Sequence, residues 1–255
     1  MNYIVTANTD IGISKNTNQD SVSLKVMNTP QGRMALAVLC DGMGGLAKGE
    51  VASASVLRAF DRWARTSLPR LCRAPLQDGV IRAEWDAIVQ EQNRLISSYG
   101  TRSGIRLGTT VVAMLITQNR YYILNVGDSR AYELSRELRV LTQDQTVVAR
   151  EVAQGLLTEA QAQTDPRRSV LLQCVGASDA VAPDFFFGTP LTGAVYMLCS
   201  DGFRHEITPA EILEGLRPDR LTNEQAMRSA AAALIELNKQ RWERDNITVA
   251  LVRTY

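Results

Sequence analysis

The chain has 255 residues, of which 45% are hydrophobic and 22% are charged. This is the composition of a globular protein, and it excludes disordered, collagen-like and coiled-coil classes. The 28 Lys and Arg residues nearly balance the 27 Asp and Glu residues, which leaves a formal net charge of +1. That balance gives no basic excess for binding nucleic acid.

The ends and the cysteines of the chain favour a cytoplasmic protein. The N-terminus, Met-Asn-Tyr-Ile-Val-Thr, has neither the basic nor the apolar region of a signal peptide. The apolar runs fall short of the roughly 18 residues that a membrane helix needs. The four cysteines are widely spaced, with no C-x-x-C pair, which predicts buried reduced thiols rather than disulfides.

A single histidine limits the metal chemistry that the chain can support. It excludes every site built on two or more imidazoles, including the H-E-x-x-H zinc proteases. Any metal must therefore be held by oxygen ligands, which favours magnesium, manganese or calcium over zinc.

The predicted elements alternate between groups of strands and groups of helices. Period-two alternation and β-branched residues predict strands, whereas apolar residues three or four positions apart predict helices. In the first half of the chain we predict strands over 21–26 and 34–40, then a helix from 49 whose apolar face carries Val56, Ala59, Phe60 and Trp63, and a helix over 80–98 with Ile81, Trp85, Ile88 and Leu95 on one side. Strands follow over 109–117 and 121–126, with a hairpin of 131–134 and 138–141. In the second half we predict a helix over 146–154, an exposed loop or flap over 155–170, a strand over 195–199, a helix over 226–237 and a strand over 247–252.

The strand over 109–117 is apolar on both faces, so one face can pack on a second sheet and the other under helices. No linker rich in Pro, Gly or Ser divides the sequence. We therefore expect one domain over residues 1–255 in the α+β class, with two antiparallel sheets sandwiched between helical layers.

Two apolar runs end abruptly in the same dipeptide, at Asp41-Gly42 and at Asp201-Gly202. A strand end holds a carboxylate rigidly, and glycine lets the backbone turn so that its carbonyl can also face an ion. Three more acids, Asp20, Asp128 and Asp245, stand next to predicted strands. Each aspartate alone is typical of a turn or a helix cap, but five gathered carboxylates would repel one another unless cations lay between them. The pattern favours a pair of divalent ions.

Seven segments, in this order and across nearly the whole chain, carry a family resemblance. They are Asn18-Gln19-Asp20-Ser21, Cys40-Asp41-Gly42-Met43-Gly44-Gly45, Leu107-Gly108-Thr109-Thr110, Val126-Gly127-Asp128-Ser129-Arg130, Leu141-Thr142-Gln143-Asp144, Ser200-Asp201-Gly202 and Asp245-Asn246-Ile247-Thr248. In these segments the chain resembles the metal-dependent protein phosphatases of type 2C, in their bacterial form.

The resemblance implies a four-layer α-β-β-α sandwich with two Mn²⁺ or Mg²⁺ ions at one end of the sheets. Asp41 would bridge the two ions, and the carbonyl of Gly42 would bind one of them. Asp201 and Asp245 would complete the other ion's ligands.

The same resemblance implies the reaction. A water bridging the two cations would attack the phosphorus of phosphoserine or phosphothreonine in a protein. Asp20 would act mainly through water on a metal, and Asp128 would serve a weaker third ion. The partners implied are phosphorylated proteins, including a bacterial Ser/Thr kinase, and the flap around residues 150 to 170 would influence substrate choice. We expect a monomer that binds neither nucleic acid nor membranes.

Three positions depart from the family pattern. Lys15 stands where the family usually has a phosphate-binding arginine, and lysine keeps the charge but loses the planar fork. We hypothesise that Lys15 contacts the phosphate; the alternative is a solvated loop lysine. Gln19 replaces a common glutamate, which removes a carboxylate from the metal site. Met43 stands where animal members have a histidine proposed as general acid.

Other polar residues allow two interpretations each. His205, four residues after Asp201, is either a proton donor or an ordinary loop histidine. Arg130 either clamps phosphate or, as we favour, pairs with a turn carboxylate. Arg167 and Arg168 in the flap either meet acidic phosphopeptides or are simply exposed. Three further arginines, Arg58, Arg62 and Arg65, are predicted to form a solvated helix face.

The leading hypothesis is therefore a Mn²⁺- or Mg²⁺-dependent protein serine/threonine phosphatase. The alternative is a catalytically weak or inactive relative that binds phosphoproteins, which Lys15 and Gln19 leave open. A calcium-binding structural protein is disfavoured because the D-x-D-x-D-G loop is absent.

Overall fold

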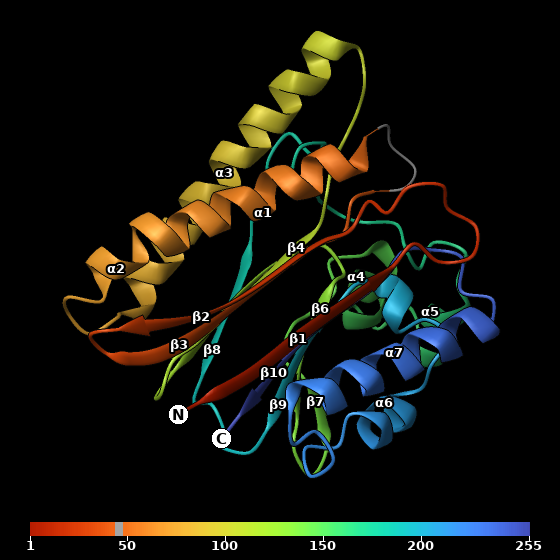
Figure 1. The fold of residues 1–255 in the computed structure, drawn as a ribbon. Helices are drawn as coiled ribbons and strands as arrows, with labels where there is room; N and C mark the ends of the chain where they lie inside the picture. The colour runs from red at the N-terminus through yellow and green to blue at the C-terminus, as the bar shows by residue number, and fades with distance from the viewer. Residues whose placement is uncertain (44–47) are drawn as a thin grey trace.

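The computed structural model describes residues 1–43 and 48–255, and it contains two five-stranded sheets whose paired neighbours are all antiparallel (Figure 1). The first sheet has the order β1 (Tyr3–Asp10), β10 (Ile247–Thr254), β9 (Val195–Cys199), β6 (Arg130–Leu134) and β7 (Leu138–Val140). The second has the order β2 (Ser21–Thr29), β3 (Gly32–Cys40), β4 (Val111–Ile116), β5 (Tyr121–Val126) and β8 (Asp184–Gly188).

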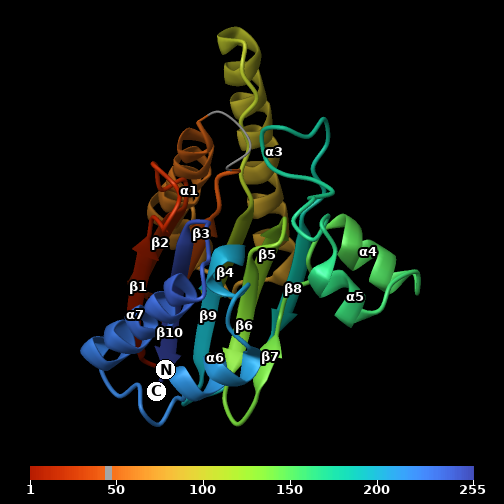
Figure 2. The ribbon, with the colours of Figure 1, turned by 90° about the vertical axis from the view of Figure 1, so that its right-hand side faces the viewer.

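Helices cover the outer face of each sheet (Figure 1). Over the second sheet lie α1 (Gly49–Thr66), α2 (Leu68–Leu71) and α3 (Asp78–Ser103), and over the first lie α6 (Pro209–Gly215) and α7 (Glu224–Gln240). Two short helices, α4 (Val147–Ala153) and α5 (Glu159–Thr164), stand to one side of the sheets (Figure 2). The predicted α-β-β-α sandwich of the α+β class is confirmed.

Three hydrophobic clusters hold the four layers together. One lies between the second sheet and its helices, around Phe60 and Trp85, whose rings meet edge to face at 5.6 Å. A second lies between the first sheet and α6 and α7, around Phe203 and Met227. The third fills the space between the sheets. Because β4 is buried over its whole length, it reads as a continuous apolar run, as predicted for a strand covered on both faces.

The predicted helix over 80–98 exists, but part of its predicted face is wrong. Leu95 is 42% exposed and Ile88 is only half-buried, whereas Val89 and Ile96 join Ile81 and Trp85 in the core. The predicted loop over 155–170 contains the short helix α5, which begins with a capping box at Thr158.

Two general expectations can be compared with the fold. All four cysteines are buried and form no disulfide in the described part of the chain, as predicted. Among the helices of the described ranges, none combines the length and apolar character needed to cross a membrane.

Candidate metal centre

Strand register brings the five predicted acids to one end of the sandwich. Ser21 at the start of β2 pairs with Cys40 at the end of β3, so Asp20 and Asp41 are neighbours. Cys199 at the end of β9 pairs with both Arg130 at the start of β6 and Val249 in β10. The loops that carry Asp128, Asp201 and Asp245 therefore open at the same end of the first sheet.

The backbone around Asp41 is fixed by hydrogen bonds. The amide of Asp41 donates to the Thr110 hydroxyl (3.0 Å), and the carbonyl of Asp41 accepts from the amide of Thr110 (2.9 Å) and the hydroxyl of Thr109 (2.8 Å). At Gly42 a Cβ would lie 2.5 Å from the carbonyl oxygen of Gln19 and 2.6 Å from the backbone of Gly49. Only glycine fits between the strand end and the start of α1.

The carboxylate of Asp20 is buried without a matching donor. In the described part of the chain neither of its oxygens has a hydrogen-bond partner at normal geometry, although the hydroxyls of Thr248 and Ser200 are near enough to lower its pKa in part. Burial, together with the charges of Asp201 and Asp245, raises the pKa of Asp20 to about 7. A buried carboxylate of this kind requires a cation or a proton.

The pKa of Asp41 is likewise raised well above its usual range. Burial is the main cause, and the charges of Asp20, Asp201, Asp128 and Asp245 add to it. All five predicted acids therefore interact electrostatically at Asp41.

The side chains do not form a finished ligand cage. Within residues 1–43 and 48–255, no three Asp, Glu, His or Cys side chains are placed as ready ligands of one ion. One predicted ligand, Asp245, instead pairs with Lys15, whose Nζ lies 2.9 Å from its Oδ1. The acids are thus close enough to repel one another, but they must reorient to share an ion.

The residues present nevertheless fit divalent cations. The buried carboxylate oxygens of Asp20 lack donors, and the donor set around them consists of oxygen, which Mg²⁺ and Mn²⁺ prefer. Gly42, whose carbonyl is a further oxygen ligand candidate, follows Asp41 directly and is packed against the backbone of Gln19 and Gly49.

His205 lies between two carboxylates rather than in an open loop. Its Nε2 is 3.7 Å from Oδ2 of Asp201, and its Nδ1 is 3.6 Å from Oε2 of Glu243. Burial lowers the pKa of His205, but the interactions with Glu243 and Asp201 outweigh it and raise the pKa above its usual value. Glu243 also accepts from the amide of Asp245 at 2.8 Å, so it supports the loop that carries this acid.

Asp128 follows Gly127, whose φ of +102° suits glycine in a tight turn. Burial and the charge of Asp201 raise the pKa of Asp128 to about 7, while Arg204 opposes the rise. Arg130 does not point a free fork at a phosphate: its Nε and one terminal nitrogen bind Asp144 at 2.7 and 2.8 Å. The favoured pairing of Arg130 with a loop carboxylate is confirmed.

Near Asp41, Gln19 and Met43 are held by neighbouring segments. The amide group of the Gln19 side chain donates to Glu50 at 3.2 Å, and the backbone amide of Met43 donates to the carbonyl of Gly108 at 3.1 Å. Gly44 and Gly45, which belong to the predicted motif, lie outside the described residues.

The arginines of the flap and of α1 are ion-paired or exposed to solvent. Arg167 binds Glu151 and Asp165, each at 2.8 Å, so its charge is already paired. The helix-face arginines, Arg58, Arg62 and Arg65, are exposed as predicted.

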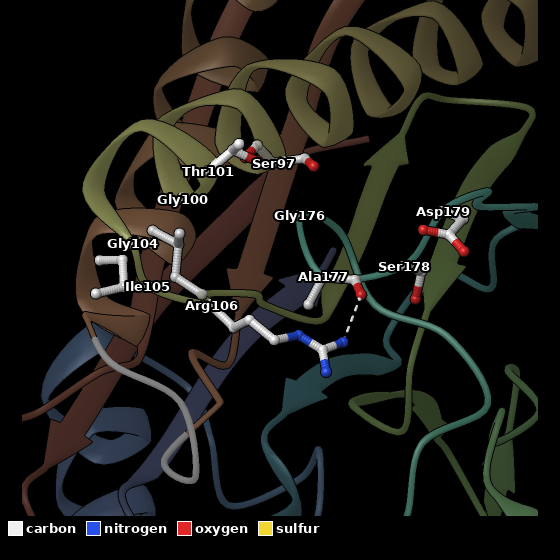
Figure 3. Close-up of a pocket in the computed structure, with 11 residues that line it drawn as sticks. Ser97, Gly100, Thr101, Gly104, Ile105, Arg106, Gly176, Ala177, Ser178 and Asp179 are labelled. Carbon is white, nitrogen blue, oxygen red and sulfur yellow. Dashed lines mark hydrogen bonds between the residues drawn. The ribbon is translucent and has the colours of Figure 1, made fainter.

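A surface pocket of about 490 Å³ lies beside the centre but contains none of the five acids (Figure 3). It is formed by the end of α3, by residues 104–107 and by residues 176–179, with Arg106 donating to the carbonyl of Ala177 at 3.0 Å. Gly108, the next residue, hydrogen-bonds Met43. The pocket therefore adjoins the five acids without containing any of them.

The sequence interpretation missed the residues that surround the acids. Glu50, Arg204 and Glu243 stand in no predicted ligand pattern, and Asp144 was quoted only as part of a motif. Only proximity in sequence could have indicated these residues as neighbours of the acids. Arg204 is three residues after Asp201, and Glu243 is two residues before Asp245.

The chain is similar in sequence and fold to known protein phosphatases. The family model described as protein phosphatase 2C matches residues 13–247. The serine/threonine phosphatase stp of Listeria innocua is 32% identical over 249 residues, which cover 96% of this chain and 93% of the relative. The solved serine/threonine phosphatase of S. agalactiae has a TM-score of 0.85 at 30% identity and full coverage of both chains. The catalytic domain of the phosphatase PstP, in complex with two manganese ions, has a TM-score of 0.77 at 30% identity over 99% of each chain. The chain therefore belongs to the protein phosphatase 2C family of serine/threonine protein phosphatases.

Proposed function

We propose that this chain hydrolyses phosphoserine and phosphothreonine in proteins with the help of Mn²⁺ or Mg²⁺ held at the end of the two sheets. The observation that carries the proposal is that the charges of Asp20, Asp128, Asp201 and Asp245 all act on Asp41, and that the buried oxygens of Asp20 have no donor among the described residues.

The family resemblance indicates the proposed ligands. Asp41 at the end of β3, the carbonyl of Gly42, Asp201 and Asp245 would hold the two ions, and Asp20 lies beside Asp41 where β2 pairs with β3. When bound, divalent ions activate water as a nucleophile and neutralise charge on the phosphoryl oxygens.

The chain's own residues would orient the substrate. Lys15 lies beside Asp245 and is 29% exposed, so its ammonium can reach a phosphate at the mouth of the site. Each acid is within two residues of a paired strand, so strand pairing restricts the backbone that carries its carboxylate. This reduces the entropy cost of arranging the carboxylates for catalysis.

The binding-module alternative is not favoured by the comparisons, since the relatives reported above are all named as phosphatases. A module that had lost catalysis would also carry the cost of this buried acid cluster without a use for it.

The test is hydrolysis of p-nitrophenyl phosphate and a phosphothreonine peptide with Mn²⁺, with Mg²⁺ and with EDTA. We expect metal-dependent turnover that Asp201→Asn abolishes. Asp219→Asn is the matched control, because Asp219 is an exposed aspartate paired with Arg217, and its neighbour Pro218 accepts from Arg253 at the end of β10 opposite to Asp245. Binding of Mn²⁺ without turnover of either substrate would overturn the proposal.

Three finer points belong to the same proposal. Residues 1–255 would act as one catalytic domain and as a monomer, which light scattering of the purified chain tests. Its protein substrates would include a Ser/Thr kinase, whose phosphothreonine content after incubation with the enzyme tests this point.

A further inference from the structure

Trp242, in the loop between α7 and β10, has a side chain that the fold does not bury. It is 75% exposed, whereas the other two tryptophans, Trp63 and Trp85, are 4% and 0% exposed. Its backbone also has a φ of +68°, a left-handed conformation that is unfavourable for a residue with a large side chain. Glycine or asparagine normally occupies this conformation after the end of a helix. Neither burial nor backbone preference therefore explains a tryptophan at this position.

The residues on either side of Trp242 fix its strained backbone. Arg241, which precedes it, is ion-paired with Glu211. Glu243, which follows it, is buried and accepts from the amide of Asp245 at 2.8 Å. Strained backbone of this kind persists only where the surroundings hold it, and it is concentrated at functional sites. The loop thus presents an exposed indole from a fixed backbone.

The loop that carries Trp242 is packed against residues 11–15. The hydroxyl of Ser14 donates to the carbonyl of Arg244 at 2.7 Å. Two apolar side chains of the same segment are also exposed, at 39% and 43%: Ile11 and Ile13. The two segments together therefore place exposed apolar side chains on one part of the surface, and such surfaces mark binding sites.

This surface adjoins the proposed phosphate contact. Lys15 is ion-paired with Asp245, which is three residues after Trp242. Three residues of extended chain span at most about 11 Å, so a peptide whose phosphate binds at Lys15 can bring a side chain about three positions away to Trp242. Arg244 is also exposed, and its charge adds to that of Lys15. The surface is thus both apolar and basic, which suits a phosphorylated segment that also carries an apolar residue.

We propose that Trp242 binds a large apolar side chain of the protein substrate, about three positions from the phosphoserine or phosphothreonine, and so makes this chain selective among phosphoproteins. A rigid indole covers apolar surface of a partner at low cost in conformational entropy. The inference rests on the proposed function, because it presumes that the substrate phosphate binds beside Lys15.

The experiment compares two phosphothreonine peptides that differ only in having leucine or serine three positions before and after the phosphorylated residue. In steady-state kinetics with Mn²⁺ we expect the wild type to favour the leucine peptide by about ten-fold or more in kcat/KM, mainly through KM. Trp242→Gly should reduce this preference to about two-fold or less. Glycine adopts a positive φ without strain, so this variant should fold at least as stably as the wild type. Trp242→Asn is a second replacement that tolerates the same backbone and should give the same result.

Tyr255→Ala is the matched control. Tyr255 is an exposed aromatic residue too, but it follows the end of β10 opposite to Asp245. This variant should keep the wild-type preference for the leucine peptide.

The possible failures of the inference and of the proposed function are distinguishable. Equal kcat/KM of the wild type for the two peptides overturns the inference and leaves the proposed function standing. An unchanged preference in Trp242→Gly, or an equal loss on both peptides, does the same. A dimer that light scattering detects in the wild type but not in Trp242→Gly would assign the surface to a second copy of the chain and would also overturn the inference. A wild type that hydrolyses neither peptide nor p-nitrophenyl phosphate overturns both.

Discussion

The ammonium group of Lys15 lies 2.9 Å from Oδ1 of Asp245, so a predicted phosphate contact is ion-paired with a predicted metal ligand. Both side chains are partly exposed, at 29% and 40%. Lys15 can therefore act in two ways. Its ammonium group can compete with a metal cation for Asp245, and it can approach a substrate phosphate once Asp245 binds the cation.

Replacing Lys15 therefore has two opposite effects. In Lys15→Met we expect Mn²⁺ to bind roughly three-fold to ten-fold more tightly, because the substitution removes a competing positive charge. We expect KM for a phosphothreonine peptide to rise about ten-fold or more, because a charge-assisted contact to phosphate is lost. Calorimetry and steady-state kinetics measure the two effects separately.

Lys15→Arg is the matched control, since it keeps the charge. Its KM should stay near the wild-type value or fall, because arginine offers a bidentate fork to phosphate. If KM and kcat of Lys15→Met equal those of the wild type, Lys15 has no part in binding phosphate.

The buried carboxylate of Asp20 should destabilise the metal-free protein. Asp20→Asn removes a charge whose oxygens have no donors among the described residues. We expect the free energy of unfolding in EDTA to rise by about 1–3 kcal/mol. Urea unfolding with EDTA and with Mn²⁺ measures this.

The same substitution should shrink the stabilisation by Mn²⁺, because an ion that binds only the folded state adds stability that grows with the logarithm of its affinity. Asp219→Asn, at an exposed position, should leave the response to Mn²⁺ unchanged. Equal metal-dependent stabilisation in Asp20→Asn and wild type would remove Asp20 from the metal centre.

The strand ends could be predicted because local sequence determines them. Asp41 and Asp201 each follow a buried run that admits few structures other than a strand, and the antiparallel register then brings their loops together. The contacts of Arg204 could not be predicted. Its partners Asp144 and Asp128 are 60 and 76 positions away in sequence, so only the assembled sheets bring them together.

The short elements β8 and α6 were not predicted from the sequence, for a different reason. The five residues of β8, Asp-Phe-Phe-Phe-Gly, show no alternation, and the seven residues of α6 make only about two turns. The apolar face of α3 is set by its neighbours in the fold: Ile96 is buried and lies against Gly176, whereas Leu95 is exposed. A helix pattern read from spacing alone cannot distinguish these two neighbours.

Gly42 should be intolerant of any side chain. A Cβ at this position would meet the backbone of Gln19 and Gly49 at 2.5 and 2.6 Å, so Gly42→Ala must move the segment before β2 or the start of α1. We expect a loss of about 1–3 kcal/mol in the free energy of unfolding, together with loss of metal-dependent turnover. Urea unfolding and the p-nitrophenyl phosphate assay measure the two effects.

Gly79→Ala is the control for Gly42. Gly79 lies in α3 with no atom within 4 Å of its added Cβ, so the stability should be unchanged or rise by less than about 1 kcal/mol. Full activity of Gly42→Ala would show that the backbone at this strand end tolerates displacement and has no strict role in the centre.

The stability of the fold in acid should depend on Glu211, which is not one of the five acids of the candidate metal centre. Glu211 caps α6 and binds Arg241, and these contacts, the Arg241 hydrogen bond first, lower its pKa from 4.5 to about 2. A depressed carboxyl pKa gives stability that is present above the unfolded value and is lost as the pH falls through the folded value. The contribution of Glu211 should therefore disappear between about pH 4.5 and pH 2. Urea unfolding of wild type and Glu211→Gln should differ above this window and converge below it. A difference that is constant from pH 6 to pH 2 would mean that the pair with Arg241 adds no pH-dependent stability.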